Sequence, residues 1–419
     1  MAKKKKDTQE VQDDLANILA DSLNKKFKDE GHKMAYFIDT EKDNPSNIKQ
    51  WISTGCDMLD LAIANRPDGG LPAGRIVEVQ GLEGAGKSLL CAHVMAETQK
   101  LGGMVVYIDT EHAMDETFFN AIGIDFNKFL YCPISKLEDV FATVEEVITK
   151  VRSGNKDVPV TIVVDSIMGA KTQQEDEAEY GKDGYATQKA IIMSKAMRKI
   201  TDLISWEKIL FICTNQLRIK MNAMFGDPYT TSGGKALGFH SSVRLRIKSM
   251  GKIKGKVNGI EQIVGMKTQV QVIKNRLGPP HKVINYDIYF DSGIDNVGGW
   301  LGVLKAYNIV KTAGAYIKYK TDAGDEHQCF AKDFEEQVMS KPEVKQELYD
   351  KICAKFIMKY QPRVHGESEL VDLGDENAIA DLAKQFDGGV SSLDTPTETP
   401  KKSLITENTD FMNETSTDK

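Results

Sequence analysis

The chain has 419 residues, more than one domain usually needs, and 41% of them are hydrophobic, enough to bury a large core. Its six cysteines form no C-x-x-C pair, which argues against a zinc ribbon and a secreted disulfide framework. The formal net charge is −7, but residues 361–419 carry 13 acidic and 5 basic side chains, a net −8, which leaves +1 for residues 1–360. No stretch is apolar for long enough to be a signal peptide or a membrane span, so we expect a soluble, cytoplasmic protein without a membrane partner.

The first predicted element is an amphipathic helix. Apolar residues recur at three- and four-residue steps over residues 15–27, and the pattern is interrupted near Gly31. An extended apolar segment follows at residues 34–38, with nothing local to pair with. The apolar face of the helix packs either on the core of its own chain or on a neighbouring subunit, and we favour the neighbour.

The next element is a phosphate-binding loop. The sequence of residues 81–88 fits G-x-x-x-x-G-K-[ST], between an alternating strand at 75–80 and a helix at 89–100. Backbone N–H groups of such a loop surround a polyphosphate, the lysine reaches its β- and γ-phosphates, and the serine hydroxyl can hold Mg²⁺. The predicted nucleotide-binding residues of this loop are Gly81, Leu82, Glu83, Gly84, Ala85, Gly86, Lys87, Ser88 and Leu89.

Later segments predict a sheet. Buried strands separated by helices are expected at residues 104–108, 161–165 and 209–213. Continuous apolar runs of this kind indicate a parallel α/β sheet covered on both faces, with functional groups at the carboxyl ends of its strands. Alternating segments that predict antiparallel strands at one sheet edge follow at residues 242–248, 268–274 and 286–290. Charged helices over residues 331–359 indicate a small terminal domain.

Two acidic residues that follow these strands indicate catalysis. Glu111 is the candidate to polarise a water for attack on a γ-phosphate, and a carboxylate at a helix start is the alternative. Asp165 fits an acidic residue that orients Mg²⁺ through water, and a turn residue is the alternative. Because the chain has no N-K-x-D sequence to select guanine, ATP is favoured over GTP.

A long loop follows the strand that ends at Asn215 and Gln216. Residues 217–234 are basic at the start and glycine-rich at the end, and few compact enzymes need such a loop structurally. Its Arg218 and Lys220, together with exposed apolar groups, suit contact with a phosphate backbone and with bases. The alternative is a lid over a small substrate.

With these motifs in place, the chain resembles the bacterial RecA family of DNA strand-exchange proteins over residues 10–360. The segments that carry the resemblance are 52–55, 70–78, 108–115, 194–199, 215–234, 239–245 and 274–276. The sequence leaves a bacterial and a phage origin open.

The resemblance implies an α/β fold: a P-loop NTPase of RecA type with a mostly parallel central sheet, at residues 46–290. We expect the N-terminal helix and a subunit-docking segment at 1–45, and a small C-terminal α+β domain at 291–360. The acidic composition of residues 361–419 predicts a disordered tail. That tail either shields a basic surface from nucleic acid or only keeps the chain soluble.

The implied function is that of an ATP-dependent recombinase with Mg²⁺ as cofactor. Such a protein forms a homo-oligomeric helical filament on single-stranded DNA, pairs it with homologous double-stranded DNA and exchanges strands during DNA repair and the SOS response. The implied reaction is DNA-dependent hydrolysis of ATP to ADP and phosphate. Single-strand-binding protein and loading mediators are candidate partners.

The resemblance also assigns roles in the nucleotide site. By position, Glu111 matches the family's catalytic glutamate and Gln216 the residue that senses the γ-phosphate. Asp115 and Phe118 fall where the family contacts adenine, although a tyrosine is more usual at the second position.

Two further basic residues match the family at the adjacent subunit's ATP. They are Lys274 and Arg276, and the family has lysine at both positions, so Arg276 keeps the charge but changes the donor geometry. Hydrolysis would then need a filament, because a neighbour supplies these cations.

The first DNA loop, residues 173–186, is acidic and departs from the family pattern, so no DNA contact is assigned to it. Lys189 and Arg198 on the following helix are better candidates. The predicted DNA-binding residues are Arg198, Arg218, Lys220, Met224, Phe225, Gly233 and Gly234.

Two other functions stay open. A ring-forming DNA motor, such as a helicase, would unwind duplex DNA as a hexamer, but residues 1–45 are too few for a separate domain ahead of the core. A DNA-coating scaffold would use hydrolysis only to disassemble.

Overall fold

The structure, a computed structural model, describes the chain over residues 16–28, 33–37, 44–154, 157–177, 185–219, 229–231, 233–322 and 324–360. All of these except Tyr360 belong to one unit of the chain, Met1–Lys359. Within these ranges, every helix is too short or too polar to cross a bilayer.

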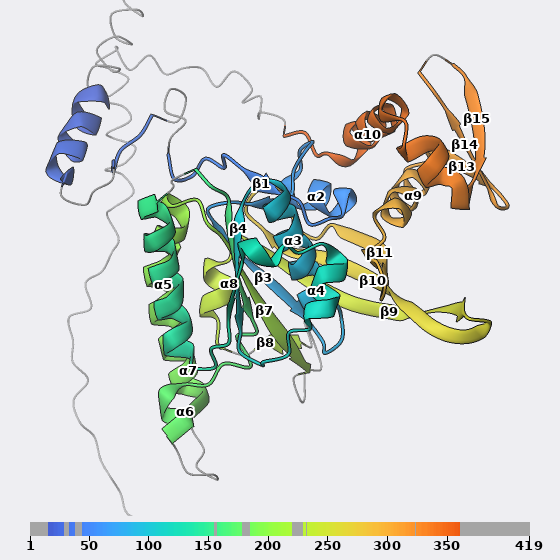
Figure 1. The fold of residues 1–419 in the computed structure, drawn as a ribbon. Coiled ribbons are helices and arrows are strands. Elements are labelled where there is room, and N and C mark those ends of the chain that lie inside the picture. The colour runs from blue at the N-terminus through green and yellow to red at the C-terminus, as the bar shows by residue number, and fades with distance from the viewer. Residues whose placement is uncertain are drawn as a thin grey trace, which may run out of the picture. The chain divides into compact units, whose positions relative to one another are not determined.

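A ten-stranded sheet lies at the centre, with the strand order β12-β11-β10-β9-β3-β7-β6-β4-β5 and with β8 paired to β7 (Figure 1). Its strands are β3 (Arg75–Gly81), β4 (Met104–Asp109), β5 (Phe129–Cys132), β6 (Val160–Asp165), β7 (Leu210–Ile219), β8 (Tyr229–Thr231), β9 (Val243–Val257), β10 (Ile260–Asn275), β11 (Val283–Tyr289) and β12 (Gly293–Ile294). Strands β9, β3, β7, β6, β4 and β5 are parallel, whereas β10, β11 and β12 add antiparallel pairs at one edge. The predicted parallel core and the antiparallel pairs at one edge are therefore confirmed. The segment predicted at 242–248 differs in that it runs parallel to β3 as well as antiparallel to β10, so it joins the two parts of the sheet.

Helices cover both faces of this sheet because side chains alternate along its strands. In β4, Val105 and Tyr107 belong to one buried cluster, and Val106 and Ile108 belong to the other. The first cluster includes α2, α3, α4 and α9, and the second includes α5, α7 and α8 (Figure 1). The helices are α2 (Asp57–Ala64), α3 (Lys87–Lys100), α4 (Glu116–Ile122), α5 (Leu137–Gly154), α6 (Gln173–Glu177), α7 (Tyr185–Trp206), α8 (Ala236–His240) and α9 (Asn296–Ala306).

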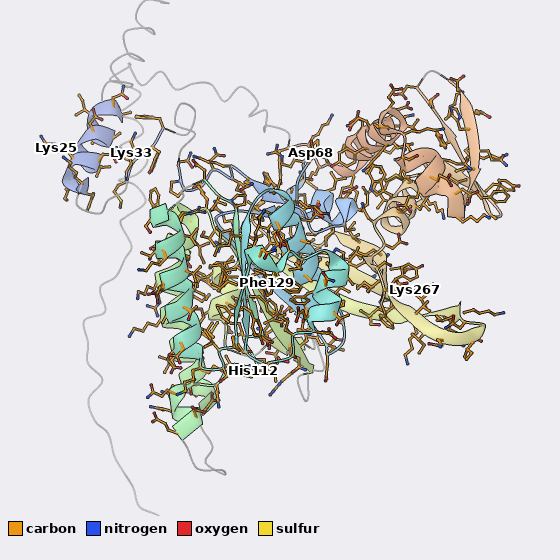
Figure 2. The ribbon with its side chains drawn as sticks, in the orientation of Figure 1. Lys25, Lys33, Asp68, His112, Phe129 and Lys267 are labelled. Atoms are coloured by element: carbon orange, nitrogen blue, oxygen red, sulfur yellow. The ribbon has the colours of Figure 1, made fainter. Side chains whose placement is uncertain are left out.

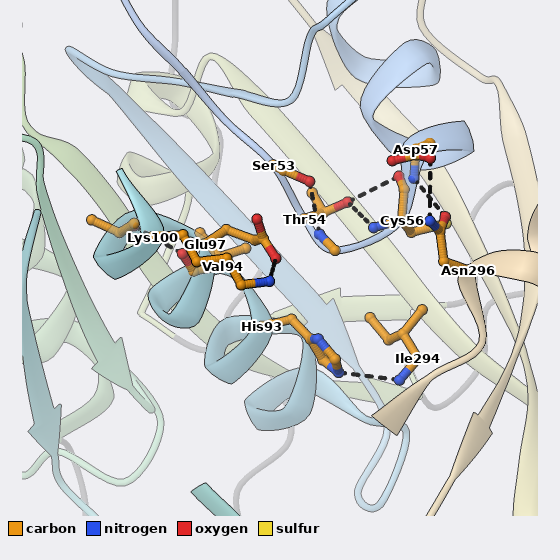
Figure 3. Close-up of polar contacts among 12 residues, drawn as sticks. Ser53, Thr54, Cys56, Asp57, His93, Val94, Glu97, Lys100, Ile294 and Asn296 are labelled. Atoms are coloured by element: carbon orange, nitrogen blue, oxygen red, sulfur yellow. Dashed lines mark hydrogen bonds and ion pairs between the residues drawn. The ribbon is translucent and has the colours of Figure 1, made fainter. Parts of the chain in front are cut away.

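Polar contacts join α3 to β12, at the far edge of the sheet, and α2 to α9 (Figure 3). His93 Nε2 on α3 accepts a hydrogen bond of 3.1 Å from the backbone N–H of Ile294. Burial lowers the pKa of His93 to about 4, so the ring stays neutral and keeps this acceptor at pH 7. The backbone N–H of Asp57 donates to Asn296 Oδ1 over 2.9 Å. The His93 contact thus helps to fix α3, whose first turn carries the candidate phosphate-binding residue Lys87.

Strands β9 and β10 extend well beyond the predicted edge strands. They form a hairpin arm, residues 249–265, that projects from the sheet (Figure 1), and Lys267 lies on β10 at its base (Figure 2). The turn is Asn258-Gly259, with φ of 52° and 84°. Two positive φ angles in an Asn-Gly pair are the geometry of a type I′ hairpin turn. This Asn-Gly signal could have extended the prediction.

The C-terminal part of the unit contains both strands and helices. A three-stranded antiparallel sheet of β13 (Val310–Ala313), β14 (Tyr316–Lys320) and β15 (Glu326–Phe330) precedes α10 (Pro342–Phe356). The predicted small C-terminal α+β part is confirmed. The charged helices predicted over residues 331–359 are a 3₁₀ helix at Ala331–Asp333, a π-helix at Glu335–Met339 and α10. The predicted domain boundaries stay a prediction.

The described N-terminal residues are helical at 16–26, as predicted. The expectation that the extended segment has no local partner is wrong. Asn24 Nδ2 donates to the carbonyl oxygen of Ala35 over 3.1 Å, and Asn24 Oδ1 accepts from the backbone N–H groups of Met34 and Ala35. A polar side chain of the helix therefore replaces the missing strand partner. The predicted tail lies outside the described residues.

Candidate nucleotide and DNA site

Strand register brings the predicted residues to one edge of the sheet. Gly81 at the end of β3 pairs with Gln216 on β7, and Asp109 on β4 pairs with Asp165 on β6. His112, labelled in Figure 2, follows β4 at this edge, next to Glu111. The carboxyl edge of the parallel sheet thus gathers the candidate phosphate, water and metal groups, as parallel sheets generally do.

The phosphate-binding loop has the predicted strand–loop–helix form. β3 ends at Gly81 and α3 begins at Lys87, so the loop occupies the turn between them. Gly86 has φ of 96°, and a Cβ there would lie 2.9 Å from Ile288 Cδ1. Only glycine suits a position with both constraints. Ser88 is exposed in the first turn of α3, where its hydroxyl is available to a ligand.

Lys87 is placed beside both acidic candidates. Its Nζ donates to the carbonyl oxygen of Leu82 within the loop over 2.9 Å. Burial lowers the pKa of Lys87, whereas the nearby charges of Asp165 and Glu111 raise it. The charges of both carboxylates therefore act on the Lys87 ammonium, which is in a position to exchange its carbonyl partner for phosphate oxygens.

Glu111 is held by the loop that follows β6. Ser166 Oγ donates to Glu111 Oε1 over 2.5 Å, and the backbone N–H of Gly169 donates to Ser166 Oγ over 3.1 Å. A Cβ on Gly169 would lie only 2.5 Å from Glu111 Cγ. Ser166 and Gly169 are thus positioning residues that the sequence analysis missed. The available signal was limited to Ser166, which directly follows Asp165 in the sequence.

The helix-start alternative for Glu111 is wrong, because Asp115 fills that role. Asp115 is the N-cap of α4, and its carboxylate accepts from the backbone N–H of Phe118 over 3.1 Å. Phe118 is half-buried against Phe119, with ring centroids 5.8 Å apart. The adenine contacts predicted for Asp115 and Phe118 stay a prediction.

Asp165 is the last residue of β6 and is buried, so the turn alternative is wrong. Its carboxylate accepts from the Tyr107 hydroxyl over 2.9 Å and from Thr214 Oγ1 over 2.5 Å. Burial and the charge of Asp165 raise the pKa of Tyr107 far above its usual value, so the phenol remains a donor. These bonds fix the orientation of the carboxylate.

The donor set of this edge fits Mg²⁺ bound together with a polyphosphate. The described residues contain no group of three or more His, Cys, Asp or Glu side chains that could hold a metal ion. Mg²⁺ is commonly bound through one or two protein oxygens plus substrate phosphates and waters, which matches the Ser88 hydroxyl and the Asp165 carboxylate.

Lys274 and Arg276 lie at another place in the unit, beside α8. Lys274 Nζ donates to the carbonyl oxygens of Gly238 (2.8 Å) and Phe239 (2.9 Å), and Arg276 Nη2 donates to that of Phe239 (3.1 Å). Burial, followed by the charges of Arg276 and Arg244, lowers the pKa of Lys274 to about 8. Phe239, whose carbonyl oxygen accepts from both cations, has a side chain that is 69% exposed to solvent.

The DNA candidates are only partly described. Arg198 is exposed on α7, and Arg218 is exposed on β7. Gly233 and Gly234 are described beside Ile167 and Ala190 respectively. Lys220, Met224 and Phe225 lie outside the described residues.

Two expectations about this region are wrong. Lys189 does not present its charge to solvent, since its Nζ donates to the carbonyl oxygens of Met168 (3.0 Å) and Ala170, and burial lowers its pKa. The strand of Gln216 does not end there either. It continues to Ile219, because β8 pairs antiparallel with residues 217–219.

Comparison with known proteins agrees with this architecture. The family model of the RecA N-terminal domain matches residues 18–295. Protein RecA of Chloroherpeton thalassium is 40% identical over 329 residues, 77% of this chain and 87% of the relative. Protein RecA of Chlorobaculum tepidum is 41% identical over 273 residues, 65% of this chain and 75% of the relative. Protein RecA of Rhodospirillum rubrum is 40% identical over 270 residues, 64% and 70% respectively.

The chain belongs to the RecA family. Its function lies in DNA recombination and repair. The predicted RecA-type α/β fold is confirmed by this match and by the mostly parallel sheet. The match to the family model, residues 18–295, includes every strand of the central sheet, from β3 to β12.

Proposed function

We propose that this RecA-family protein is a DNA-dependent ATPase that works as a filament on single-stranded DNA, pairs it with homologous double-stranded DNA and exchanges the strands. One observation carries the proposal: Lys87, Glu111 and Asp165 converge at the end of the phosphate-binding loop. Convergence of a cation, a candidate base and a candidate metal carboxylate is what phosphoryl transfer to water requires.

Each group has a distinct part in ATP hydrolysis. Lys87 leaves the Leu82 carbonyl and holds the β- and γ-phosphate oxygens. Glu111, oriented by Ser166, accepts a hydrogen bond from a water and aligns it with the γ-phosphorus. Gln216, in register with Gly81, reports the γ-phosphate to the loop that begins after β7. Mg²⁺, when bound by Ser88 and Asp165, neutralises charge on the phosphates.

The filament follows from the second cationic cluster. Lys274 and Arg276 donate to carbonyl oxygens beside α8 in their own subunit. In the proposed assembly a neighbouring copy presents its ATP to them, and their charges stabilise the γ-phosphate as it leaves. Hydrolysis is thereby coupled to assembly. The N-terminal helix and Phe239 are the proposed docking groups.

Arg198 and Arg218 are the described residues proposed to contact DNA phosphates, together with Lys220, Met224, Phe225, Gly233 and Gly234 of the long loop. Single-strand-binding protein and loading mediators are the proposed accessory partners. The proposal places the protein in the cytoplasm.

The test is Glu111→Gln with Glu116→Gln as the matched control, since Glu116 is exposed on the first turn of α4. We expect Glu111→Gln to lose DNA-stimulated hydrolysis by about 10³-fold while it still binds ATP and forms filaments in negative-stain images. Glu116→Gln should match the unaltered chain. Normal hydrolysis by Glu111→Gln would remove the site assignment, and closed rings with DNA-independent hydrolysis would favour a ring motor.

A further inference from the structure

A cavity lies at the end of α3 that is remote from the phosphate-binding loop. Its volume is about 470 Å³, and residues of β1 (Trp51–Ile52), α2, α3, α9 and α10 line it. Helix α3 begins at Lys87 and contributes Glu97 and Lys100, near its last residue, to the lining. A rise of about 1.5 Å per residue puts these positions about 15 Å or more from the loop. None of the roles proposed above uses this cavity.

Aromatic rings form part of the cavity wall. Trp51, Trp300 and Tyr349 line the cavity, and the ring centroids of Trp300 and Tyr349 lie 5.6 Å apart. Cations of the chain itself already lie over two of these rings. The guanidinium carbon of Arg66 is 5.7 Å from the centre of the Trp51 ring, and Lys345 Nζ is 5.7 Å from the centre of the Trp300 ring. Because the faces of aromatic rings attract cations, this wall favours a positively charged group.

Two carboxylates on α2 have only neutral donors as partners. Asp57 Oδ2 accepts from Trp300 Nε1 over 2.7 Å and from Asn296 Nδ2 over 3.2 Å. Asp60 is buried, and its carboxylate accepts from two hydroxyl groups and one backbone N–H of residues 53–54. Neither carboxylate forms an ion pair with a residue that the structure describes. Their charges are therefore open to a cationic ligand.

The net charge of the lining is negative. The charged side chains that line the cavity are Asp57, Asp60, Asp68, Glu97, Lys100 and Lys345. Lys100 pairs with Glu97 over 2.6 Å, whereas Lys345 forms no ion pair within the described part of the chain. Burial raises the pKa of Asp60 to about 7, and the charge of Asp57 contributes to the rise. Even when Asp60 is protonated, the other three carboxylates outnumber the two ammonium groups.

Trp51 supplies an unpaired donor at the same wall. Its indole Nε1 is buried and has no hydrogen-bond partner among the residues that the structure describes. Because an indole N–H can only donate, only an acceptor can satisfy it. Buried polar groups are nearly always hydrogen-bonded. A ligand that carries an acceptor beside its cation would therefore suit this cavity better than a simple cation.

We propose that this cavity binds a basic amino acid, with its cationic group beside Asp57 and over the Trp300 ring, and with an oxygen that accepts from Trp51 Nε1. The ligand's cation takes the place of the Lys345 ammonium over that ring. The basic amino acid is either free, with its carboxylate as the acceptor, or a residue of a partner protein, with a peptide carbonyl oxygen as the acceptor. The inference depends on neither ATP hydrolysis nor DNA binding.

The test uses the full chain and its tryptophan fluorescence. The chain has three tryptophans, and Trp206→Phe leaves only the two that line the cavity. In this background, fluorescence is titrated with L-arginine, which represents the free amino acid, and with N-acetyl-L-arginine amide, which represents a residue within a peptide. L-citrulline, a neutral isostere of arginine, is the ligand control.

Three variants are compared, each in the Trp206→Phe background: Asp57→Asn, Lys345→Gln and Trp51→Phe. The matched control is Asp139→Asn, because Asp139 is an exposed aspartate in the first turn of another helix, α5. It removes the same charge as Asp57→Asn at a place outside the cavity.

We expect a saturable change with arginine or its blocked form and none with citrulline. Asp57→Asn keeps an oxygen for Trp300 Nε1 but loses the charge, so binding should weaken by roughly tenfold or more. Lys345→Gln removes the competing ammonium, so binding should become about two- to fivefold tighter. Trp51→Phe loses the indole N–H, so binding should weaken roughly two- to tenfold. Asp139→Asn should leave the affinity unchanged.

Tighter binding of N-acetyl-L-arginine amide would assign the cavity to a residue of a protein partner, and tighter binding of L-arginine would assign it to a free amino acid. The proposal would be overturned if neither gave a saturable change up to about 10 mM, where a millimolar site is filled. Equal binding of citrulline, or equal affinities in Asp57→Asn and Lys345→Gln, would overturn it as well. Should Asp57→Asn fail to fold, Lys345→Gln decides, since it changes a partly exposed side chain.

Discussion

Two clusters of charged residues differ in which groups their side chains contact. The loop cluster consists of Lys87, Glu111 and Asp165, and the α8 cluster consists of Lys274 and Arg276. In the loop cluster, charged side chains face one another, and Ser166, Tyr107 and Thr214 fix the carboxylates. In the α8 cluster, both cations donate to the carbonyl oxygen of Phe239 in α8, Lys274 also donates to that of Gly238, and the pKa of Lys274 is lowered. The first cluster contains two carboxylates, whereas the second contains cations alone, with Glu78, which is paired with Arg244, as the nearby anion. This contrast supports the proposal that a neighbouring copy completes the site.

Mixing two inactive variants tests that contrast most sharply. Lys274→Ala and Glu111→Gln should each lose about 10³-fold in hydrolysis, because each removes a group proposed to act on the γ-phosphate. In a mixed filament, some interfaces join an intact Glu111 to a neighbour's intact Lys274. With random mixing in equal amounts, about a quarter of the interfaces are of this kind, so about a quarter of the activity should return.

The measurement is steady-state ATP hydrolysis on single-stranded DNA. Its control is a mixture of Glu111→Gln with Glu111→Gln,Lys274→Ala, in which no interface can regain activity. Equal rates for the two mixtures would show that Lys274 acts on the ATP of its own subunit.

Gly169→Ala tests how rigidly the loop cluster is set. The added Cβ would lie 2.5 Å from Glu111 Cγ and 2.6 Å from Thr110 Oγ1, so Glu111 must move. A displacement of about 1 Å at a catalytic group can cost about 10²-fold in rate. We therefore expect kcat to fall by about that factor with a smaller change in KM. Gly154→Ala is the matched control, because nothing lies within 4 Å of the added Cβ.

Most of the loop cluster was predictable from sequence, because each of its residues is marked by a local sequence pattern. The phosphate-binding loop is a contiguous motif, and Glu111 and Asp165 follow apolar runs that could only be buried parallel strands. Parallel register then brings strand ends together without further information. The support of Glu111 by Gly169 was not predictable, because that contact joins two loops whose separation only the fold defines.

Ser166→Ala should have a smaller effect than Gly169→Ala. It removes the hydroxyl that donates to Glu111 Oε1 but leaves the packing unchanged. Loss of one hydrogen bond to a charged group costs roughly 1.5–3 kcal/mol, or about tenfold to a hundredfold if it is lost only in the transition state. Ser166→Thr, which keeps a hydroxyl, should restore part of kcat. An unaltered kcat in Ser166→Ala would assign the orientation of Glu111 to packing alone.

The structure around the proposed DNA contacts was less predictable from the sequence. The strand of Gln216 seemed to end at a polar pair, but pairing with Tyr229–Thr231 extends it to Ile219. The helical spacing of Lys189 and Arg198 suggested that both side chains contact DNA. The ammonium of Lys189 instead donates to the carbonyl oxygens of Met168 and Ala170. In both cases a partner distant in sequence decided the outcome, and periodicity carries no information about such partners.

The last and smallest predicted effect concerns Lys274 of the α8 cluster. Raising the pH should change the rate of hydrolysis and the stability of the fold in opposite directions. The pKa of Lys274 is lowered from 10.5 to about 8 by burial and by the neighbouring cations Arg276 and Arg244. As pH rises past about 8 the ammonium loses its charge, so hydrolysis that depends on this charge should fall. Lys274→Arg keeps its charge throughout this range and should remove the alkaline decline.

Unfolding should respond in the other direction. Between pH 8 and 10.5 the unfolded chain holds a proton on Lys274 that the folded chain has released, so the contribution of Lys274 to stability rises with pH. Melting temperatures of the unaltered chain relative to Lys274→Arg should therefore increase over the range in which relative activity decreases. If both decline together, alkaline unfolding explains the activity loss. Opposite trends would instead show that the charged form of Lys274 destabilises the folded subunit and takes part in catalysis.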